Sequence, residues 1–366
     1  MSVNTVLADA AGRQRPGHGR LDLTGAEVAA IRSLAADLAA RHTGPDGVLR
    51  HHEAFLHDAA VQAHELPRRL RLFLAGVRTR ESAAVSVIGG LPVDDDRIGP
   101  TPRAWQSHRT TSPTAIEETA FVLCGSLLGD LFGWATQQDG TIVHDLMPLP
   151  GHEHDQLGTG SADALLWHTE EAFHPLKCDY LGLMGLRNHD RIATTVATID
   201  AVPIRAELRD VLRAARFVIR PDDSHLGRSQ ATDAGNADGP TARLVAQAQR
   251  RMEEMNAAPD PVPVLSGDPE NPYLCIDPYY MDAAPGDAEA RAALDLFAKD
   301  IDARLTEVTI MPGEMCFIDN YRAVHGRQKF QARYDGTDRW LKRINVTRDL
   351  RKSRAHRQSA ESRVVY

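Results

Sequence analysis

The chain has 366 residues, of which 42% are hydrophobic and 25% charged, with a formal net charge of −8 at pH 7. This composition is typical of a soluble globular protein, and the lack of an apolar run of about 18 residues argues against a membrane-spanning helix. The negative charge argues against nucleic acid as a partner, because nucleic-acid binding depends on neutralising phosphates. Neither a membrane nor a nucleic acid is therefore expected as a partner, while the oligomeric state stays open.

The N-terminal segment and the cysteines bear on location. No apolar stretch follows the scattered basic residues of the N-terminal segment, so a secretory signal is not expected. The four cysteines are far apart and show no C-x-x-C spacing, which predicts neither a zinc cluster nor a disulfide framework. We expect buried, reduced thiols and a cytoplasmic protein.

Helices are predicted mainly in the first third of the chain. Residues 21–42 carry apolar side chains at near-helical spacing, and Thr24 with Glu27 forms a capping-box pattern at their start. Other patterns predict helices at residues 66–75 and 114–131 and a buried strand with its turn at residues 83–93. Residues 1–133 are therefore expected to form a mainly helical flank.

From residue 134 onward, short β-branched runs alternate with Gly, Pro, Asn and Asp. A helix is expected at residues 287–305, and the polar stretch 221–240 is expected to be a long loop inserted between strands. This pattern predicts a β-sandwich or jelly-roll core over residues 134–350, within one domain that spans 1–366. Strands are predicted at residues 142–146, 164–168, 180–187, 194–199, 216–219, 273–276, 305–310, 315–319 and 341–347.

The first motif with chemical meaning is Trp167-His168-Thr169-Glu170, at the end of a predicted strand. Side chains two residues apart on a strand share a face, so His168 and Glu170 can bind adjacent positions of one metal. A third ligand from another strand would complete the facial triad of a non-haem iron(II) site. Alone, H-x-E is a weak signal because it is common by chance.

The second motif lies in residues 312–327, where a turn, a buried strand and an Asn-containing loop lead to His325. Arg339 and Arg343 follow, and on a strand they share one face. Two planar guanidinium forks so placed can grip two carboxylates, although the arginines alone would also fit a solvated basic strand. Together the motifs predict an iron site that binds carboxylates.

With these motifs, the chain resembles the iron(II)/2-oxoglutarate dioxygenases of the clavaminate synthase-like group, especially its free arginine, citrulline and enduracididine hydroxylases. The resemblance covers roughly residues 80–350. It implies an α+β fold, in which helices flank a double-stranded β-helix (jelly-roll, cupin-like) core, and the use of Fe(II), 2-oxoglutarate and O2. The matching residues are Gly160, Ser161, His168, Thr169, Glu170, Glu171, Ala172, Phe173, His174, Gly313, Asp319, Asn320, His325, Arg339 and Arg343.

The resemblance also implies the ligands of the metal and the cosubstrate. Arg339 would bind the distal carboxylate of 2-oxoglutarate, helped by a hydroxyl group of Thr194 or Thr195. It implies no catalytic residue beyond the metal ligands. The implied iron ligands are His168, Glu170 and His325.

The substrate contacts implied by the resemblance come from separate parts of the chain. Arg343 would hold the substrate carboxylate, and Gln137 would contact the α-amino group together with Glu170. The Gly-rich segment 151–163, which contains Leu157, matches a flexible lid over the substrate. The lid would place Leu157 against the substrate.

The far end of the substrate would face Asp277, where arginine hydroxylases of this group have the first of two acids. Their second acid is Tyr279 in this sequence. One carboxylate and a phenol suit a neutral urea group, or a singly anchored cation, better than a doubly clamped guanidinium.

The predicted activity is hydroxylation, at C3 or C4, of a free L-amino acid with a long polar side chain, with citrulline or arginine favoured. Peptide-antibiotic biosynthesis is the expected context. The alternatives are a zinc-dependent His2Glu hydrolase, a desaturase or cyclase of the same family, and a cupin-like binding protein whose histidines are core residues. The paired arginines and the absence of H-E-x-x-H favour iron over zinc.

Overall fold

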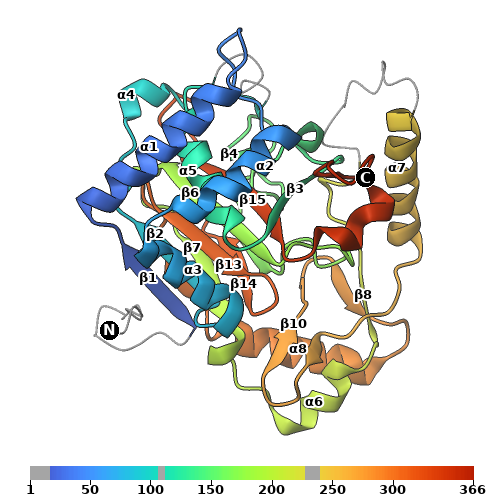
Figure 1. The fold of residues 1–366 in the computed structure, drawn as a ribbon. Coiled ribbons are helices and arrows are strands. Elements are labelled where there is room, and N and C mark those ends of the chain that lie inside the picture. The colour runs from blue at the N-terminus through green and yellow to red at the C-terminus, as the bar shows by residue number, and fades with distance from the viewer. Residues whose placement is uncertain (1–16, 106–111, 227–239) are drawn as a thin grey trace.

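The structure is a computed structural model that describes residues 17–105, 112–226 and 240–366. Figure 1 shows one group of helices beside the large sheet and a second group, around α6 and α8, at the other end of the molecule. Within the described ranges, every helix is too short or too polar to span a lipid bilayer. The helices are α1 (Gly25–His42), α2 (Glu53–Gln62), α3 (Arg68–Arg80), α4 (Asp95–Ile98), α5 (Ala115–Ser126), α6 (Ala206–Arg213), α7 (Pro240–Ala257) and α8 (Ala288–Asp302).

The large sheet has the strand order β1-β2-β13-β6-β15-β3-β16, with β4 beside β15, and the small sheet has the order β12-β7-β14-β5. Two short pairs, β8 with β11 and β9 with β10, lie near α6 and α8. The strands of the large sheet are β1 (His18–Asp22), β2 (Val85–Gly89), β3 (Asp130–Trp134), β4 (His144–Leu146), β6 (Tyr180–Arg187), β13 (Met315–Asp319), β15 (Trp340–Thr347) and β16 (Val364–Val365). The others are β5 (Leu165–His168), β7 (Thr194–Thr198), β8 (Phe217–Ile219), β9 (Leu265–Gly267), β10 (Pro272–Leu274), β11 (Met281–Ala283), β12 (Thr306–Val308) and β14 (Ala323–Arg327).

An apolar layer joins the large sheet to the small one. Leu183 of β6 and Ile318 of β13 belong to the same buried cluster as Val196 of β7 and Val308 of β12. Strands β6 and β13 coincide with the predicted bounds, and most other predicted strands agree to within a few residues. The prediction of a fold with mixed α and β content is confirmed.

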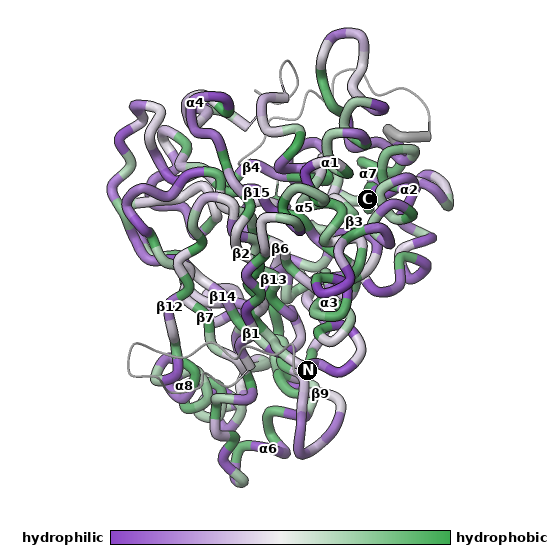
Figure 2. Tube along the Cα trace, turned by 60° about the vertical axis from the view of Figure 1, so that its left-hand side comes forward, coloured by the Kyte–Doolittle hydropathy of each residue, from purple (hydrophilic) through white to green (hydrophobic). Residues whose placement is uncertain are grey.

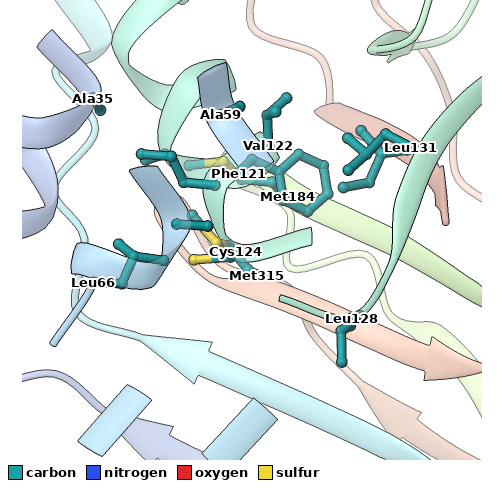
Figure 3. Packing of buried hydrophobic residues seen from close by; sticks show 14 of the residues in the cluster. Ala35, Ala59, Leu66, Phe121, Val122, Cys124, Leu128, Leu131, Met184 and Met315 are labelled. Atoms are coloured by element: carbon teal, nitrogen blue, oxygen red, sulfur yellow. The ribbon is translucent and has the colours of Figure 1, made fainter. Parts of the chain in front are cut away.

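Helices α1, α2, α3 and α5 pack against the large sheet through a second apolar cluster. The predicted capping box of α1 is confirmed, because Glu27 N donates to Thr24 Oγ1 at 3.3 Å and Thr24 N donates to Glu27 Oε2 at 2.8 Å. Phe121 of α5 lies beside Met184 of β6 in Figure 3, and its ring centroid is 5.7 Å from that of Phe317. Figure 2 shows hydrophobic segments gathered along the central strands β6 and β13.

Several elements differ from the sequence predictions. The helix predicted at residues 114–131 is too long: α5 ends at Ser126, and Asp130 begins β3, which pairs with β15. Sequence patterns missed β1, which runs parallel to β2 at the edge of the large sheet, and also missed α2, α6 and α7. The structure of these segments depends on tertiary contacts, which local sequence patterns do not contain.

The predicted loop at 221–240 can be compared with the structure only in part. Residues 227–239 lie outside the described residues, and Pro240 already begins α7. The four cysteines are free thiols, as predicted, and Cys275 is half-buried whereas the other three are buried.

Two glycines with the same backbone conformation differ in the space around them. Gly313 has a φ of +80°, and an ideal Cβ there would lie 1.7 Å from the Leu91 carbonyl oxygen. Gly286 has a φ of +81°, but a Cβ there would meet nothing within 4 Å. Gly313 is therefore required both by its dihedral angle and by the close approach of the chain before β13.

The pair allows the two effects to be separated. Gly286→Ala should lower the free energy of unfolding by about 1–2 kcal/mol through left-handed strain alone. Gly313→Ala should lower it by roughly 2–5 kcal/mol, because overpacking adds to that strain. Urea unfolding of both variants measures the difference, and equal losses would show that the backbone at Gly313 relaxes freely.

Candidate metal and ligand site

Strands β5 and β14 bring two histidines of the small sheet face to face. His168 and His325 are partners in the antiparallel register, with ring centroids 4.5 Å apart. Glu170 follows β5, and its Oε2 lies 3.5 Å from His168 Nε2 and 3.1 Å from His325 Nε2. The three potential ligand atoms all lie within 4.8 Å of one another. Two imidazoles and one carboxylate in this arrangement can hold one face of a divalent metal ion.

Hydrogen bonds from neighbouring groups orient these side chains. The side-chain amide of Asn320 accepts from Glu170 N at 2.8 Å and donates to the carbonyl oxygens of Glu170 at 3.0 Å and Cys178 at 2.9 Å. His168 Nδ1 lies 2.8 Å from the Leu166 carbonyl oxygen, an acceptor, so this nitrogen carries the proton and Nε2 is left to face the carboxylate. Such supporting bonds fix the tautomer and orientation that metal binding needs.

The carboxylate of Glu170 is held in its ionised form. Burial acts to raise its pKa, but the charge of Arg343 and hydrogen bonds from both histidines outweigh burial and hold this pKa well below the usual value. Arg343 Nη1 donates to Glu170 Oε1 at 2.7 Å, and Nη2 contacts Gln137 Oε1 at 2.6 Å and His144 Nδ1 at 2.7 Å. Because Arg343 occupies Oε1, Oε2 is the oxygen directed at the histidines.

All but one of the predicted site residues line a single cavity around the three potential ligands. The exception is Thr195, because side chains alternate along β7 and that of Thr194 faces the cavity. The predicted residues in the cavity wall are Gln137, Leu157, His168, Glu170, Thr194, Asp277, Tyr279, His325, Arg339 and Arg343.

One end of the cavity is strongly basic. Arg339 is 7% exposed, and its Nη2 donates to Thr194 Oγ1 at 3.3 Å. Burial and the charge of Arg327 lower the pKa of Arg339 to about 9, so it stays positive at neutral pH. Arg327 also lines the cavity, although the sequence analysis gave it no role. This end is suited to an anionic group such as a carboxylate.

Another part of the cavity wall is acidic, and only one of its two carboxylates was predicted from the sequence. Asp277 lines it, as expected, but so does Asp222, which lies just after β8 in the stretch predicted to be a loop. Burial raises the pKa of Asp277, and the negative charge of Asp222 adds to the increase. Tyr279 also lines the cavity but is 55% exposed. A second carboxylate is therefore present, and it comes from Asp222 rather than from the position of Tyr279.

The metal affinity should depend on Asn320. Asn320→Ala removes the bonds that fix the Glu170 backbone, so binding of a divalent metal should weaken about 10- to 100-fold. Competition with a chelating dye measures this affinity. Asn271→Ala, in an exposed turn, is the control. Unchanged affinity in the Asn320 variant would contradict the role assigned to this amide.

Comparisons with known proteins agree with this geometry. Residues 116–345 match the family described as taurine catabolism dioxygenase TauD, TfdA family. The chain is 46% identical to enduracididine beta-hydroxylase of Streptomyces hygroscopicus (94% of this chain, 99% of the relative) and 43% identical to L-ornithine/L-arginine 3-hydroxylase of Catenulispora acidiphila (95% and 99%). It superposes on the crystal structure of the non-heme iron oxygenase OrfP in complex with Fe, succinate and (3S)-hydroxy-L-Arg, with a TM-score of 0.86, 41% identity, and coverage of 95% of this chain and 99% of OrfP.

Proposed function

Because this chain belongs to the taurine catabolism dioxygenase TauD, TfdA family, we propose that it hydroxylates a free, arginine-like L-amino acid with iron(II), 2-oxoglutarate and dioxygen. The observation that carries the proposal is a single cavity whose wall holds a potential metal triad, the two arginines Arg327 and Arg339, and the two aspartates Asp222 and Asp277. The zinc-hydrolase alternative finds no support, since the relatives are hydroxylases and iron oxygenases.

The residues present fit iron(II). His168 Nε2, His325 Nε2 and Glu170 Oε2 would hold it, and these atoms already converge on one point. When bound, iron(II) with 2-oxoglutarate and dioxygen supplies the oxidising chemistry that hydroxylates an unactivated carbon and leaves succinate and carbon dioxide. Three protein ligands would leave coordination positions of the ion available to these reactants.

The cavity's own residues would orient the cosubstrate and the substrate. Arg339 and Thr194 would hold the distal carboxylate of 2-oxoglutarate. The substrate carboxylate would be held by Arg343, whose buried Nε has no partner among the described residues. The side chains of Gln137 and Glu170, both bonded to Arg343, lie where the α-ammonium group would approach.

The acidic end would then select the substrate's side chain. Asp222 Oδ1 accepts from Ser224 N at 2.8 Å, and Asp277 Oδ1 accepts from the backbone of Tyr279 at 3.0 Å and Tyr280 at 3.1 Å. Among the described residues, no donor bonds to the Oδ2 atom of either aspartate. Two carboxylates with a free oxygen favour a cation such as guanidinium over the neutral urea of citrulline. Arginine or a close relative, attacked at C3 or C4, is the proposed substrate.

We also propose the finer fold and location expected from the resemblance. The two facing sheets, with β6, β13 and β15 in one and β7, β12, β14 and β5 in the other, support a double-stranded β-helix core. Four free cysteines support residence in the reducing cytoplasm.

The activity can be tested with purified protein, iron(II), 2-oxoglutarate and a panel of arginine, homoarginine, ornithine, lysine and citrulline. Succinate release should be stimulated most by the arginine-like members. His168→Ala should reduce it to background through loss of a metal ligand, whereas His189→Ala, at a half-exposed surface position, should leave it unchanged. A wild-type protein that responds to no member of the panel would refute the proposed function.

The acidic end can be tested by removing one charge. Asp222→Asn should lower kcat/KM for arginine about tenfold relative to citrulline, because a charge-assisted hydrogen bond becomes a neutral one. Asp223→Asn, next to it but outside the cavity wall, is the matched control. If kcat/KM for arginine and kcat/KM for citrulline changed by the same factor, Asp222 would not be the group that distinguishes a charged from a neutral side chain.

A further inference from the structure

We propose that Arg327 is a second guanidinium for the distal carboxylate of 2-oxoglutarate, acting beside Arg339 and Thr194. The inference rests on the proposed function and adds to it a residue that binds the cosubstrate. It starts from the position of Arg327 on β14, two residues beyond His325, where strand geometry places both side chains on the same face.

The strand register places Arg327 next to the other two groups. Arg327 is the direct partner of Thr194 in the antiparallel pair of β14 and β7, and directly opposed side chains lie on the same face. Thr194 Oγ1 in turn accepts from Arg339 Nη2 at 3.3 Å. All three residues line the same cavity. Strand β7 therefore provides the hydroxyl group of Thr194, β14 the guanidinium of Arg327, and the residue before β15 the guanidinium of Arg339, all in one part of the cavity wall.

The guanidinium of Arg327 has donors that the protein does not use. Arg327 is 3% exposed, and its Nη2 donates to the Asp163 carbonyl oxygen at 3.1 Å, but its Nε and Nη1 have no partner within the described chain. The Nε of Arg339 is likewise buried without a partner there. Buried donors are normally satisfied, so unpaired donors on residues that line a cavity indicate a missing acceptor.

The charge of this pair is also uncompensated. The described residues provide no carboxylate ion pair to Arg327 or Arg339, although both carry a buried positive charge. Arg187 shows the usual arrangement: it is also 3% exposed, but its Nε and Nη2 donate to Asp95 Oδ1 at 2.9 and 2.7 Å. Two adjacent buried cations without a counter-ion are costly, and an anion that binds between them removes this cost.

A carboxylate matches these unused donors. Its two oxygens offer about four lone-pair sites, more than one guanidinium and one hydroxyl occupy. The competing explanation is structural: Arg327 also stacks on Phe330, with its Cζ 5.1 Å from the ring centroid, and bonds to the backbone at Asp163. A structural role would affect every ligand of the cavity equally, whereas a role in carboxylate binding would affect only ligands that carry the distal carboxylate.

Anaerobic calorimetry of the iron(II)-loaded protein can separate these two roles. The ligands are 2-oxoglutarate and 2-oxopentanoate, in which a methyl group replaces the distal carboxylate. Arg327→Gln should weaken 2-oxoglutarate binding about tenfold or more, as expected for losing hydrogen bonds to a charged group, and leave 2-oxopentanoate binding unchanged. Arg327→Lys, which keeps the charge but loses the fork, should give an intermediate affinity. Arg333→Gln, at a surface ion pair with Asp190, should change neither affinity.

The other outcomes have distinct meanings. Equal weakening of both ligands by Arg327→Gln would overturn the proposal in favour of a structural role, and so would no weakening of either. If Arg327→Gln does not fold, the affinity ratio of the two ligands in Arg327→Lys decides: a ratio equal to that of the wild type overturns the proposal. A wild-type protein that binds neither 2-oxo acid would refute the proposed function instead.

Discussion

The register between β5 and β14 is the constraint on which the site depends. It sets His168 directly opposite His325, and Glu170 reaches both rings from the turn that follows β5. A shift by one residue would send each histidine to the opposite face of the small sheet. Asn320, at the end of β13, ties the backbone of Glu170 to the large sheet. The hydrogen bonds of Asn320 therefore help to hold the potential metal ligands in place.

The cavity wall carries charges of both signs. Arg327 and Arg339 are neighbouring cations, Glu170 and Arg343 form an ion pair, and the negative charge of Asp222 acts on Asp277. In a site shielded from water, these fixed charges act strongly on any ligand. A dicarboxylate and a basic amino acid would each find complementary charge in one orientation. The fold would thus determine both where each ligand binds and in which orientation.

The sequence carried much of the site because its signals are local. The spacing predicted that His168 with Glu170, and Arg339 with Arg343, share one face of a strand. All four line the cavity, but Glu170 follows β5 and Arg339 precedes β15, so a strand carries only one member of each pair. The sequence could not tell whether Thr194 or Thr195 lines the cavity, because it does not show which face of β7 points inward. The capping box of α1 was predictable for the same reason, since its two residues are three apart.

What the sequence did not reveal depends on long-range contacts. Asp222 stands in a polar stretch without periodicity, so nothing local shows that it lines the same cavity as Asp277. Arg327 follows His325 and Gly326, and the sequence pattern there drew attention to the histidine as a potential metal ligand rather than to the arginine. Its importance appears only when its register with Thr194 and its unpaired donors are seen together.

The most direct test of this account is a crystal structure of the protein with iron(II), 2-oxoglutarate and L-arginine, grown without oxygen. The account predicts that iron lies between His168, Glu170 and His325, the distal carboxylate of 2-oxoglutarate lies at Arg339, and the guanidinium of arginine lies at Asp222 and Asp277. Arginine bound with its guanidinium away from both aspartates, or a metal bound elsewhere, would contradict it.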